Sequence, residues 1–281
     1  MIRQEGDVKK KPGLGRPFFL AALVGLSLIL GSKPSEAAPL QLPADQPFPR
    51  NDANSRKAHA QLLEKAKKGG IDVYFEGDSI VRRWGATDYP QNLANWNENF
   101  YGWNAADFGW GADRIENILW RLENGELDGV HPKVIVLLGG TNNIAPNPWV
   151  ATSNPSDLLL GFKKILETME SKAPEATIIL MGIFPRNDHM ELIPTINEVN
   201  AGLAKLADGK KVRYLNINDK LADKDGKLFD GMMNPADHLH PALKGYQVWA
   251  DALKPIFTEL LGPPSKTDHA PPPTGDPSAA W

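Results

Sequence analysis

Apolar and polar residues alternate in blocks along residues 51–262, and these blocks predict strands and helices in turn. The strand candidates are short apolar runs rich in β-branched residues, such as 134–138 (VIVLL), which are typical of strands covered on both faces. The helix candidates carry apolar residues on one face, as Ile115 and Leu119 do within 114–122. We predict strands at 71–76, 105–108, 134–138, 177–182 and 212–217, and helices at 57–68, 114–122, 156–171, 192–207 and 243–261.

Strand and helix candidates alternate about five times along this body. That order predicts an α/β sandwich around a parallel sheet. In such folds the functional residues gather beyond the carboxyl ends of the strands. A motif that carries chemistry should therefore directly follow a predicted strand or lie beside one.

Composition narrows the class of protein further. The chain has 281 residues, of which 42% are hydrophobic and 23% charged, and this excludes a mainly disordered protein. The absence of cysteine excludes a disulfide scaffold, a thiolate metal site and a cysteine nucleophile. The folded body of about 210 residues favours one domain over two.

The amino-terminal segment, residues 1–37, has the pattern of a secretory signal peptide. Basic residues precede an apolar run at 18–30, and small residues follow up to Ala37. Because this run is shorter than the roughly 20 residues that cross a bilayer, an uncleaved anchor is the weaker interpretation. We therefore predict cleavage after Ala37, export to the periplasm or exterior, and no permanent membrane span.

Removal of the signal peptide changes the charge of the protein. The chain holds 31 Lys+Arg and 34 Asp+Glu, and residues 1–37 contribute six and three of these, so the net charge falls from −3 to −6. An acidic surface disfavours nucleic acid as a partner. Residues 38–50 are Pro-rich and are predicted to be a linker, whereas 263–281 are Pro-rich with little apolar content and predict a disordered tail.

The first candidate for chemistry is Gly77-Asp78-Ser79, which directly follows the first predicted strand. A hydroxyl placed there could act as a nucleophile, because a following helix N-terminus stabilises an alkoxide. Val81 occupies the last glycine position of G-x-S-x-G, so an α/β-hydrolase elbow is not indicated. For the tripeptide alone, an ordinary capping turn is the favoured interpretation.

The second and third candidates are turns that could bind an oxyanion. Gly109-Trp110-Gly111-Ala112-Asp113 follows the second strand, and glycines there let backbone N–H groups approach a ligand. Asn142 follows the third strand, and its amide can donate to a developing oxyanion. Both segments could also be simple turns, and the first lacks the spacing of a dinucleotide-binding motif.

The fourth candidate is Asp237-His238-Leu239-His240-Pro241, which precedes the last predicted helix. An aspartate three residues before a histidine can orient the imidazole through Nδ1 and leave Nε2 free as a base. A metal site is the alternative, although His238 and His240 lie too close together to be comfortable ligands and no further ligand is evident.

Together these motifs resemble the SGNH (GDSL-type) hydrolase superfamily, and most of all its branch of platelet-activating-factor acetylhydrolase catalytic subunits. The resemblance covers roughly residues 52–262. It rests on the order of the four motifs and on longer matching runs. These runs are 75–79 (FEGDS), 107–111 (DFGWG), 119–127 (LWRLENGEL), 132–134 (PKV), 140–143 (GTNN), 184–186 (FPR) and 239–241 (LHP).

The resemblance implies a flavodoxin-like three-layer sandwich with a five-stranded parallel sheet and ester hydrolysis without a cofactor or metal. Ser79 would be the nucleophile, His240 the base and Asp237 its orienting partner. The oxyanion donors would be the Ser79 N–H, the Asn142 side chain and one backbone N–H of the second motif. The alignment places that last donor at Ala112, where the family has glycine, and a shift of one residue would give Gly111 instead.

The substrate is predicted less sharply than the reaction. Export and tryptophans near the active edge favour an acetylated carbohydrate, whereas the resemblance favours a small acyl lipid. Trp84, Trp110 and Leu239 are the candidates for substrate binding, although packing is the favoured role for any one tryptophan. Acyl transfer, a homodimer and a non-catalytic glycan-binding protein on the same fold remain open alternatives.

Overall fold

Residues 38–278 are described by the computed structural model of the protein. The predicted signal peptide and its cleavage site lie outside these residues. Among the described helices, none is both long enough and apolar enough to cross a membrane.

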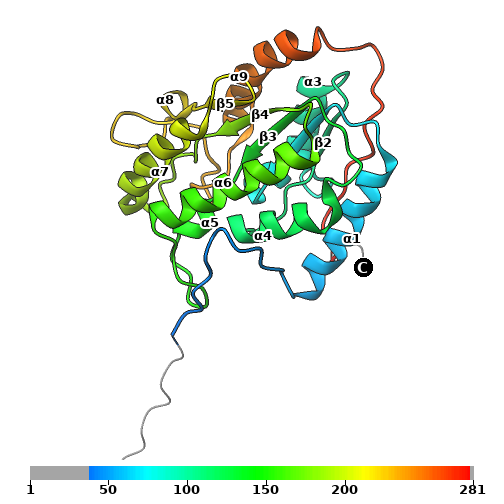
Figure 1. Cartoon of the computed structure of the whole chain (residues 1–281). Helices are drawn as coiled ribbons and strands as arrows, with labels where there is room; N and C mark the ends of the chain where they lie inside the picture. Colours follow the sequence, from blue (N-terminus) through cyan, green and yellow to red (C-terminus); the bar gives the residue numbers. More distant parts are fainter. Residues whose placement is uncertain (1–37, 279–281) are drawn as a thin grey trace, which may run out of the picture. The chain divides into compact units, whose positions relative to one another are not determined.

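A five-stranded parallel sheet forms the centre of residues 38–278, with the strand order β2-β1-β3-β4-β5 (Figure 1). This order is that of a flavodoxin-like fold, so the predicted architecture is confirmed. The chain adds β2 on one side of β1 and β3 on the other, so the strand order reverses between β1 and β3. Ligands of such folds bind outside the carboxyl ends of the strands at that point. The strands are β1 (Val73–Gly77), β2 (Ala105–Asp107), β3 (Val134–Leu138), β4 (Thr177–Met181) and β5 (Val212–Leu215).

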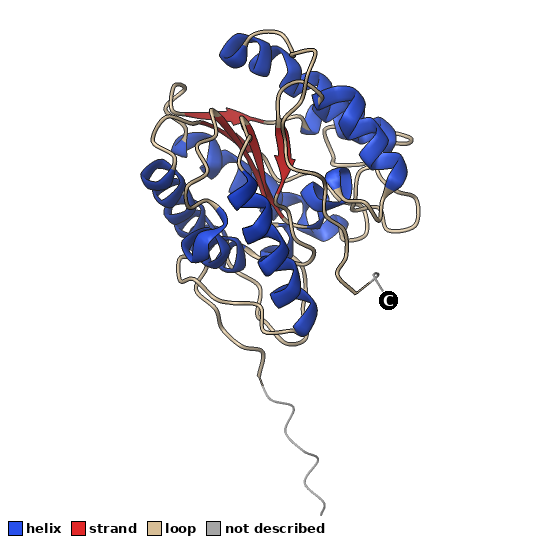
Figure 2. Ribbon diagram, turned by 90° about the vertical axis from the view of Figure 1, so that its right-hand side faces the viewer, coloured by secondary structure: helices blue, strands red, loops and turns tan. Residues whose placement is uncertain are grey.

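Helices cover both faces of the sheet, which gives three layers (Figure 2). One face packs against α1 (Ala53–Lys68), α4 (Ile115–Arg121), α6 (Pro155–Lys172) and α7 (Ile193–Leu206). The other packs against α2 (Ser79–Gly85), α3 (Pro90–Phe100) and α9 (Leu243–Leu261). Shorter segments are η1 (Leu122–Glu126), α5 (Thr141–Ile144), η2 (Met190–Leu192) and α8 (Asn218–Leu221).

The two faces of β1 contribute to two separate hydrophobic cores, because successive side chains of a strand point in opposite directions. Tyr74 stacks on Phe108 in the core beneath α1 and α4. Phe75 lies in the opposite core, called here the aromatic core because it is rich in aromatic rings, among them Trp84, Trp249 and Phe257. Such rings bury large areas and fix their neighbours' geometry. The aromatic core therefore anchors α2, the helix that begins at the candidate nucleophile.

The C-terminal segment after α9 differs from the prediction of a disordered tail, because its described part, 263–278, lies against the body. The Asp268 carboxylate accepts hydrogen bonds from the backbone N–H groups of Gly102 and Asn104. Farther along, Thr274 accepts a hydrogen bond of 2.9 Å from the buried Lys65 ammonium. The low apolar content of this segment predicted disorder, but the contacts that hold it against the body are polar.

Candidate active site

The candidate nucleophile, Ser79, is the first residue of α2 and directly follows the carboxyl end of β1. Asp78 caps the helix, because its Oδ1 accepts the N–H of Ile80 at 2.9 Å. Burial raises the pKa of Asp78 to about 7. Ser79 is half-buried, unlike its fully buried neighbours Asp78 and Ile80.

The structure brings Ser79, His240 and Asp237 together, although 161 positions separate Ser79 and His240 in the sequence. Ser79 Oγ lies 2.8 Å from His240 Nε2, and His240 Nδ1 lies 2.9 Å from Asp237 Oδ2. The other carboxylate oxygen of Asp237 accepts the backbone N–H groups of Leu239 and His240. This chain of contacts has the geometry of a serine, a base and an orienting acid.

The loop before α9 aims the imidazole at Ser79. His238 adopts a left-handed backbone with φ of 50°, and its carbonyl accepts the N–H of Asn187. The carbonyl of His240 accepts the N–H of Asn234 at 2.8 Å. His238 is exposed, and His240 is the histidine of the Asp237–Pro241 motif that contacts Ser79.

The pKa of Asp237 and that of His240 are both lowered by their surroundings. Partial burial acts to raise the pKa of Asp237, but hydrogen bonds from the backbone N–H groups of His240 and Leu239 outweigh it and lower this pKa to about 2. The pKa of His240 is lowered, chiefly by burial and then by the positive charge of Arg83, against the opposing effect of Asp237. A neutral imidazole can accept the proton of a serine hydroxyl.

Arg83 is a contributor that the sequence analysis missed. It lies one helical turn after Ser79 on α2, and its Nη1 donates to Asp237 Oδ2 at 3.1 Å. The same carboxylate oxygen therefore contacts both Arg83 and His240. The spacing of four residues from Ser79 is the signal that could have indicated it, because residues i and i+4 share a face of a helix.

The turn after β2 presents backbone donors beside α4. Ala112 has a left-handed φ of 63°, and the N–H of Asp113 donates to the Trp110 carbonyl. The carbonyl of Gly111 accepts from Arg50. Within residues 38–278, the hydrogen bonds include none from the N–H of Gly111 or Ala112. Both candidates for the oxyanion donor thus remain available in this turn.

Asn142, the third candidate donor, lies beyond the carboxyl end of β3. The register pairs Gly77 of β1 with Leu138 of β3, so the segments that carry Ser79 and Asn142 leave the sheet side by side. Asn142 Nδ2 donates to the carbonyl of Asp113 at 2.8 Å. One amide hydrogen remains, and the bond that is made joins Asn142 to the turn after β2.

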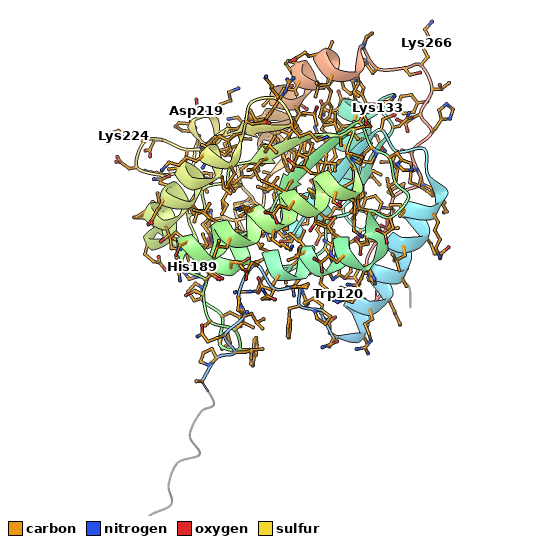
Figure 3. All side chains as sticks on the ribbon, in the orientation of Figure 1. Trp120, Lys133, His189, Asp219, Lys224 and Lys266 are labelled. Atoms are coloured by element: carbon orange, nitrogen blue, oxygen red, sulfur yellow. The ribbon has the colours of Figure 1, made fainter. Side chains whose placement is uncertain are left out.

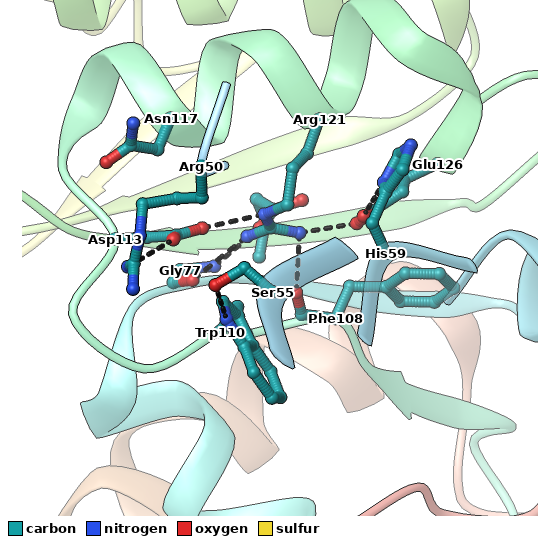
Figure 4. Close-up of polar contacts among 12 residues, drawn as sticks. Arg50, Ser55, His59, Gly77, Phe108, Trp110, Asp113, Asn117, Arg121 and Glu126 are labelled. Atoms are coloured by element: carbon teal, nitrogen blue, oxygen red, sulfur yellow. Dashed lines mark hydrogen bonds and ion pairs between the residues drawn. The ribbon is translucent and has the colours of Figure 1, made fainter. Parts of the chain in front are cut away.

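A buried ion cluster lies beneath this turn and centres on Arg121 of α4 (Figure 4). All five N–H groups of the guanidinium donate, so the cation has no donor left for a ligand. The acceptors are the carboxylates of Glu76, Asp113 and Glu126 and the carbonyls of Gly77 and Phe108. The cluster joins the end of β1, the end of β2 and the turn that follows β2.

Burial is the largest influence on the pKa of two carboxylates in this cluster, Glu76 and Asp113. It raises the pKa of Glu76 to about 8 and that of Asp113 to about 6, even though the Arg121 guanidinium opposes both shifts. Glu126 also contacts His59 Nδ1 at 2.6 Å (Figure 4). Carboxylates that are difficult to ionise and a fully bonded cation are typical of a structural cluster.

Two tryptophans assigned to substrate binding are packing residues in the structure. Trp84 is fully buried on α2 among the rings of the aromatic core, and Trp110 is 8% exposed. The Trp110 indole donates to Ser55 Oγ at 2.9 Å, and the Arg82 guanidinium lies 5.0 Å from its ring. The prediction for Trp84 is wrong, because α2 turns that side chain into the core, and Trp110 is likewise turned inward.

Other predicted or considered residues have clear positions. Leu239 is half-buried beside His240 and packs against the aromatic core. Trp149 is 77% exposed. Arg186 is buried, with Asp188 bonded to its Nε and Nη2 and Thr141 to its Nη1. Its guanidinium is therefore used in contacts within the fold.

The remaining histidines lie apart from the triad geometry. His189, labelled in Figure 3, lies on the surface and pairs with Glu191 at 2.7 Å. Across residues 38–278, no group of three or more His, Asp or Glu side chains is arranged to hold a metal ion.

Comparison with known proteins identifies the family. The GDSL-like lipase/acylhydrolase family model matches residues 75–248. The chain belongs to this family. Its matched region contains Ser79, Asp237 and His240, and family membership makes the protein a hydrolase of the esterase class.

Relatives of this GDSL-like hydrolase include acetylhydrolase subunits. The chain is 29% identical over 225 residues to human platelet-activating factor acetylhydrolase IB subunit alpha1, covering 78% of this chain and 91% of that protein. It is 29% identical over 208 residues to the rat alpha2 subunit, covering 72% and 83%.

Solved structures agree on the fold. A GDSL-like lipase from Bacteroides thetaiotaomicron superposes with a TM-score of 0.56 at 17% identity, covering 73% of this chain and 98% of that one. An active-site mutant of a family two carbohydrate esterase from Clostridium thermocellum gives a TM-score of 0.51 at 16% identity, covering 68% and 64%. At these identities the likeness concerns the fold alone.

Proposed function

We propose that this GDSL-like hydrolase is an exported serine esterase that removes short acyl groups, acetyl above all, through Ser79, His240 and Asp237. The 2.8 Å contact between Ser79 Oγ and His240 Nε2, with Asp237 on the other ring nitrogen, carries the proposal. The names of the acetylhydrolase relatives support a short acyl group.

The reaction follows from this geometry. His240 takes the Ser79 proton while Oγ attacks the ester carbonyl, and Asp237 keeps the imidazole in the useful tautomer. The Ser79 N–H, Asn142 and a backbone N–H of Gly111 or Ala112 stabilise the oxyanion, each by about 3–4 kcal/mol. The alcohol leaves with the proton from His240, and water then releases the acid from the acyl-enzyme.

Replacement of the nucleophile tests the reaction. Ser79→Ala should reduce hydrolysis of p-nitrophenyl acetate by about 10⁴-fold or more while circular dichroism and the melting temperature stay near those of the parent. A fluorophosphonate probe should label the parent protein and not the variant. Unchanged turnover in Ser79→Ala would refute the nucleophile, and a folded parent that resists labelling would favour the non-catalytic glycan-binding alternative.

Export and assembly are separate parts of the proposal. N-terminal sequencing of protein recovered outside the cytoplasm should begin at Ala38, and an intact Met1 would contradict cleavage. The homodimer implied by the acetylhydrolase resemblance stays a prediction that sedimentation equilibrium tests. A release assay on acetylated sugars, aryl acetates and acetylated lysophospholipids separates the two substrate classes.

A further inference from the structure

A surface pocket of about 410 Å³ opens directly beside the candidate base. His240 and other residues of the loop before α9 form one part of its wall, and α2, Tyr89, α3 and the start of α9 form the rest. The charged side chains that line it are all positive, since two cations and three amides line the pocket and its lining includes no aspartate or glutamate. These polar lining residues are Arg83, Lys244, Gln91, Asn92 and Asn234.

Each of the two cations has N–H groups that are not used in hydrogen bonds within the described residues. Arg83 donates from Nη1 to Asp237, and its guanidinium lies 5.4 Å from the Tyr89 ring on the pocket wall. Lys244 donates to the backbone carbonyl of Asp230 at 3.0 Å. Among the described residues, the other N–H groups of these two side chains have no hydrogen-bond acceptor. Side-chain exposure of 26% keeps Arg83 accessible from the pocket.

The chemistry of ester cleavage says which half of a substrate enters this pocket. His240 must return its proton to the alcohol that leaves, so the alcohol lies against the imidazole. The oxyanion donors lie at Gly111, Ala112 and Asn142, and none of them lines the pocket. The pocket beside His240 is therefore on the leaving-group side.

We propose that this pocket binds the alcohol half of the ester and that Arg83 and Lys244 recognise an anionic group on that alcohol. A carboxylate or a phosphate fits, because both accept several charge-assisted hydrogen bonds from such donors. Arg83 lies one helical turn, roughly 5–6 Å, from Ser79 along α2, so the anionic group belongs to the part of the alcohol near the scissile bond. The inference rests on the proposed esterase function.

Matched acetate esters test the inference. The set is 4-acetoxybenzoate, 4-acetoxyphenyl phosphate, neutral methyl 4-acetoxybenzoate and cationic (4-acetoxybenzyl)trimethylammonium, each kcat/KM being divided by the hydroxide rate of the same ester. The parent protein should prefer an anionic over the neutral ester by about threefold to tenfold, and salt should reduce this preference. Whichever anion is preferred identifies a carboxylate or a phosphate as the natural group.

Variants assign the preference to the pocket. Lys244→Gln and Arg83→Gln should each lower the ratio of anionic to neutral kcat/KM, and Lys244→Glu should shift the preference toward the cationic ester. Lys220→Gln, which removes an exposed lysine of α8 outside the pocket, should leave the ratio as it is. Equal use of anionic and neutral esters, unmoved by Lys244→Glu, would overturn the inference while the esterase stands. Failure of the esterase proposal looks different, because no ester would turn over and fluorophosphonate would not label Ser79.

Discussion

Two arginines near the active edge contrast in a way that separates structure from function. Arg121 is buried and uses all five N–H groups on protein acceptors. Arg83 is partly exposed, donates one hydrogen bond to Asp237 and faces a pocket with its remaining donors. A cation whose donors are all satisfied within the fold can only hold the fold, whereas one with free donors at a pocket can meet a ligand.

The two regions are nevertheless connected. Arg121 bonds the side chain of Asp113, and the carbonyl of Asp113 accepts from Asn142. Arg121 also bonds the carbonyl of Gly77, two residues before Ser79. The buried cluster thus contacts the segments that carry Ser79 and the proposed oxyanion donors, and such preorganisation is what electrostatic catalysis needs.

The largest effect should come from removing the buried cation. Arg121→Met leaves three buried carboxylates without their common partner, so the free energy of unfolding should fall by about 3–5 kcal/mol. Arg83→Met should cost less than about 1 kcal/mol, because its ion pair is partly exposed to water. Urea denaturation of both variants measures the difference. Equal losses in the two would mean that Arg121 is not a structural cation.

The sequence predicted the sheet because buried parallel strands leave a clear mark. The run at 134–138 is apolar throughout, and the structure buries all of it in β3. Helix α9 was likewise predicted with the bounds it has, Leu243–Leu261, because its apolar face repeats over many turns. The helices α2 and α3 were not predicted, since seven residues hold too little periodicity and α3 is rich in asparagine.

Side-chain direction explains why the site was predicted only in part. The order of the motifs predicted that Ser79, Asp237, His240 and Asn142 lie together, and the structure places them at one edge of the sheet. The same order could not predict the direction of the Trp84 side chain, because that direction depends on α2, a helix that the sequence pattern did not predict. Nor could composition reveal that Arg121 gathers three carboxylates from different segments, because such a cluster exists only after the chain has folded.

Asn142 and Asn143 are adjacent in the sequence, and they allow the candidate active edge and the buried layer beneath it to be compared directly. Asn142→Ala removes a side chain that offers a hydrogen to the oxyanion, so kcat should fall by about 100-fold with KM little changed. Asn143 is fully buried and bonds the Ile115 N–H and Glu116, so Asn143→Ala should lower the free energy of unfolding by about 1–3 kcal/mol.

Active-site titration with a fluorophosphonate keeps these two effects apart, because kcat is then counted per functional site. Asn143→Ala should retain kcat per titrated site near that of the parent, and Asn142→Ala should not. If both variants lost kcat alike, the distinction between an open catalytic edge and a buried structural layer would fail at this position.

The smallest expected effect is a shift in the pH profile. The ester reaction needs neutral His240, so kcat/KM falls as the pH drops through the pKa of that imidazole, which burial and Arg83 together hold below its ordinary value of 6.5. Arg83→Gln removes a positive charge that disfavours the imidazolium, so the acid limb should move to higher pH, by less than about one unit. Asp237, with a pKa of about 2, stays ionised across this range and does not contribute to the limb.

The pH profiles are measured on neutral methyl 4-acetoxybenzoate, so that the shift does not depend on an anion bound in the pocket. Lys220→Gln is the matched control, because it removes a positive charge outside the pocket. A limb that stays in place or moves to lower pH would show that Arg83 does not act on the base, and its contact with Asp237 would then belong with the structural ion pairs, as that of Arg121 does.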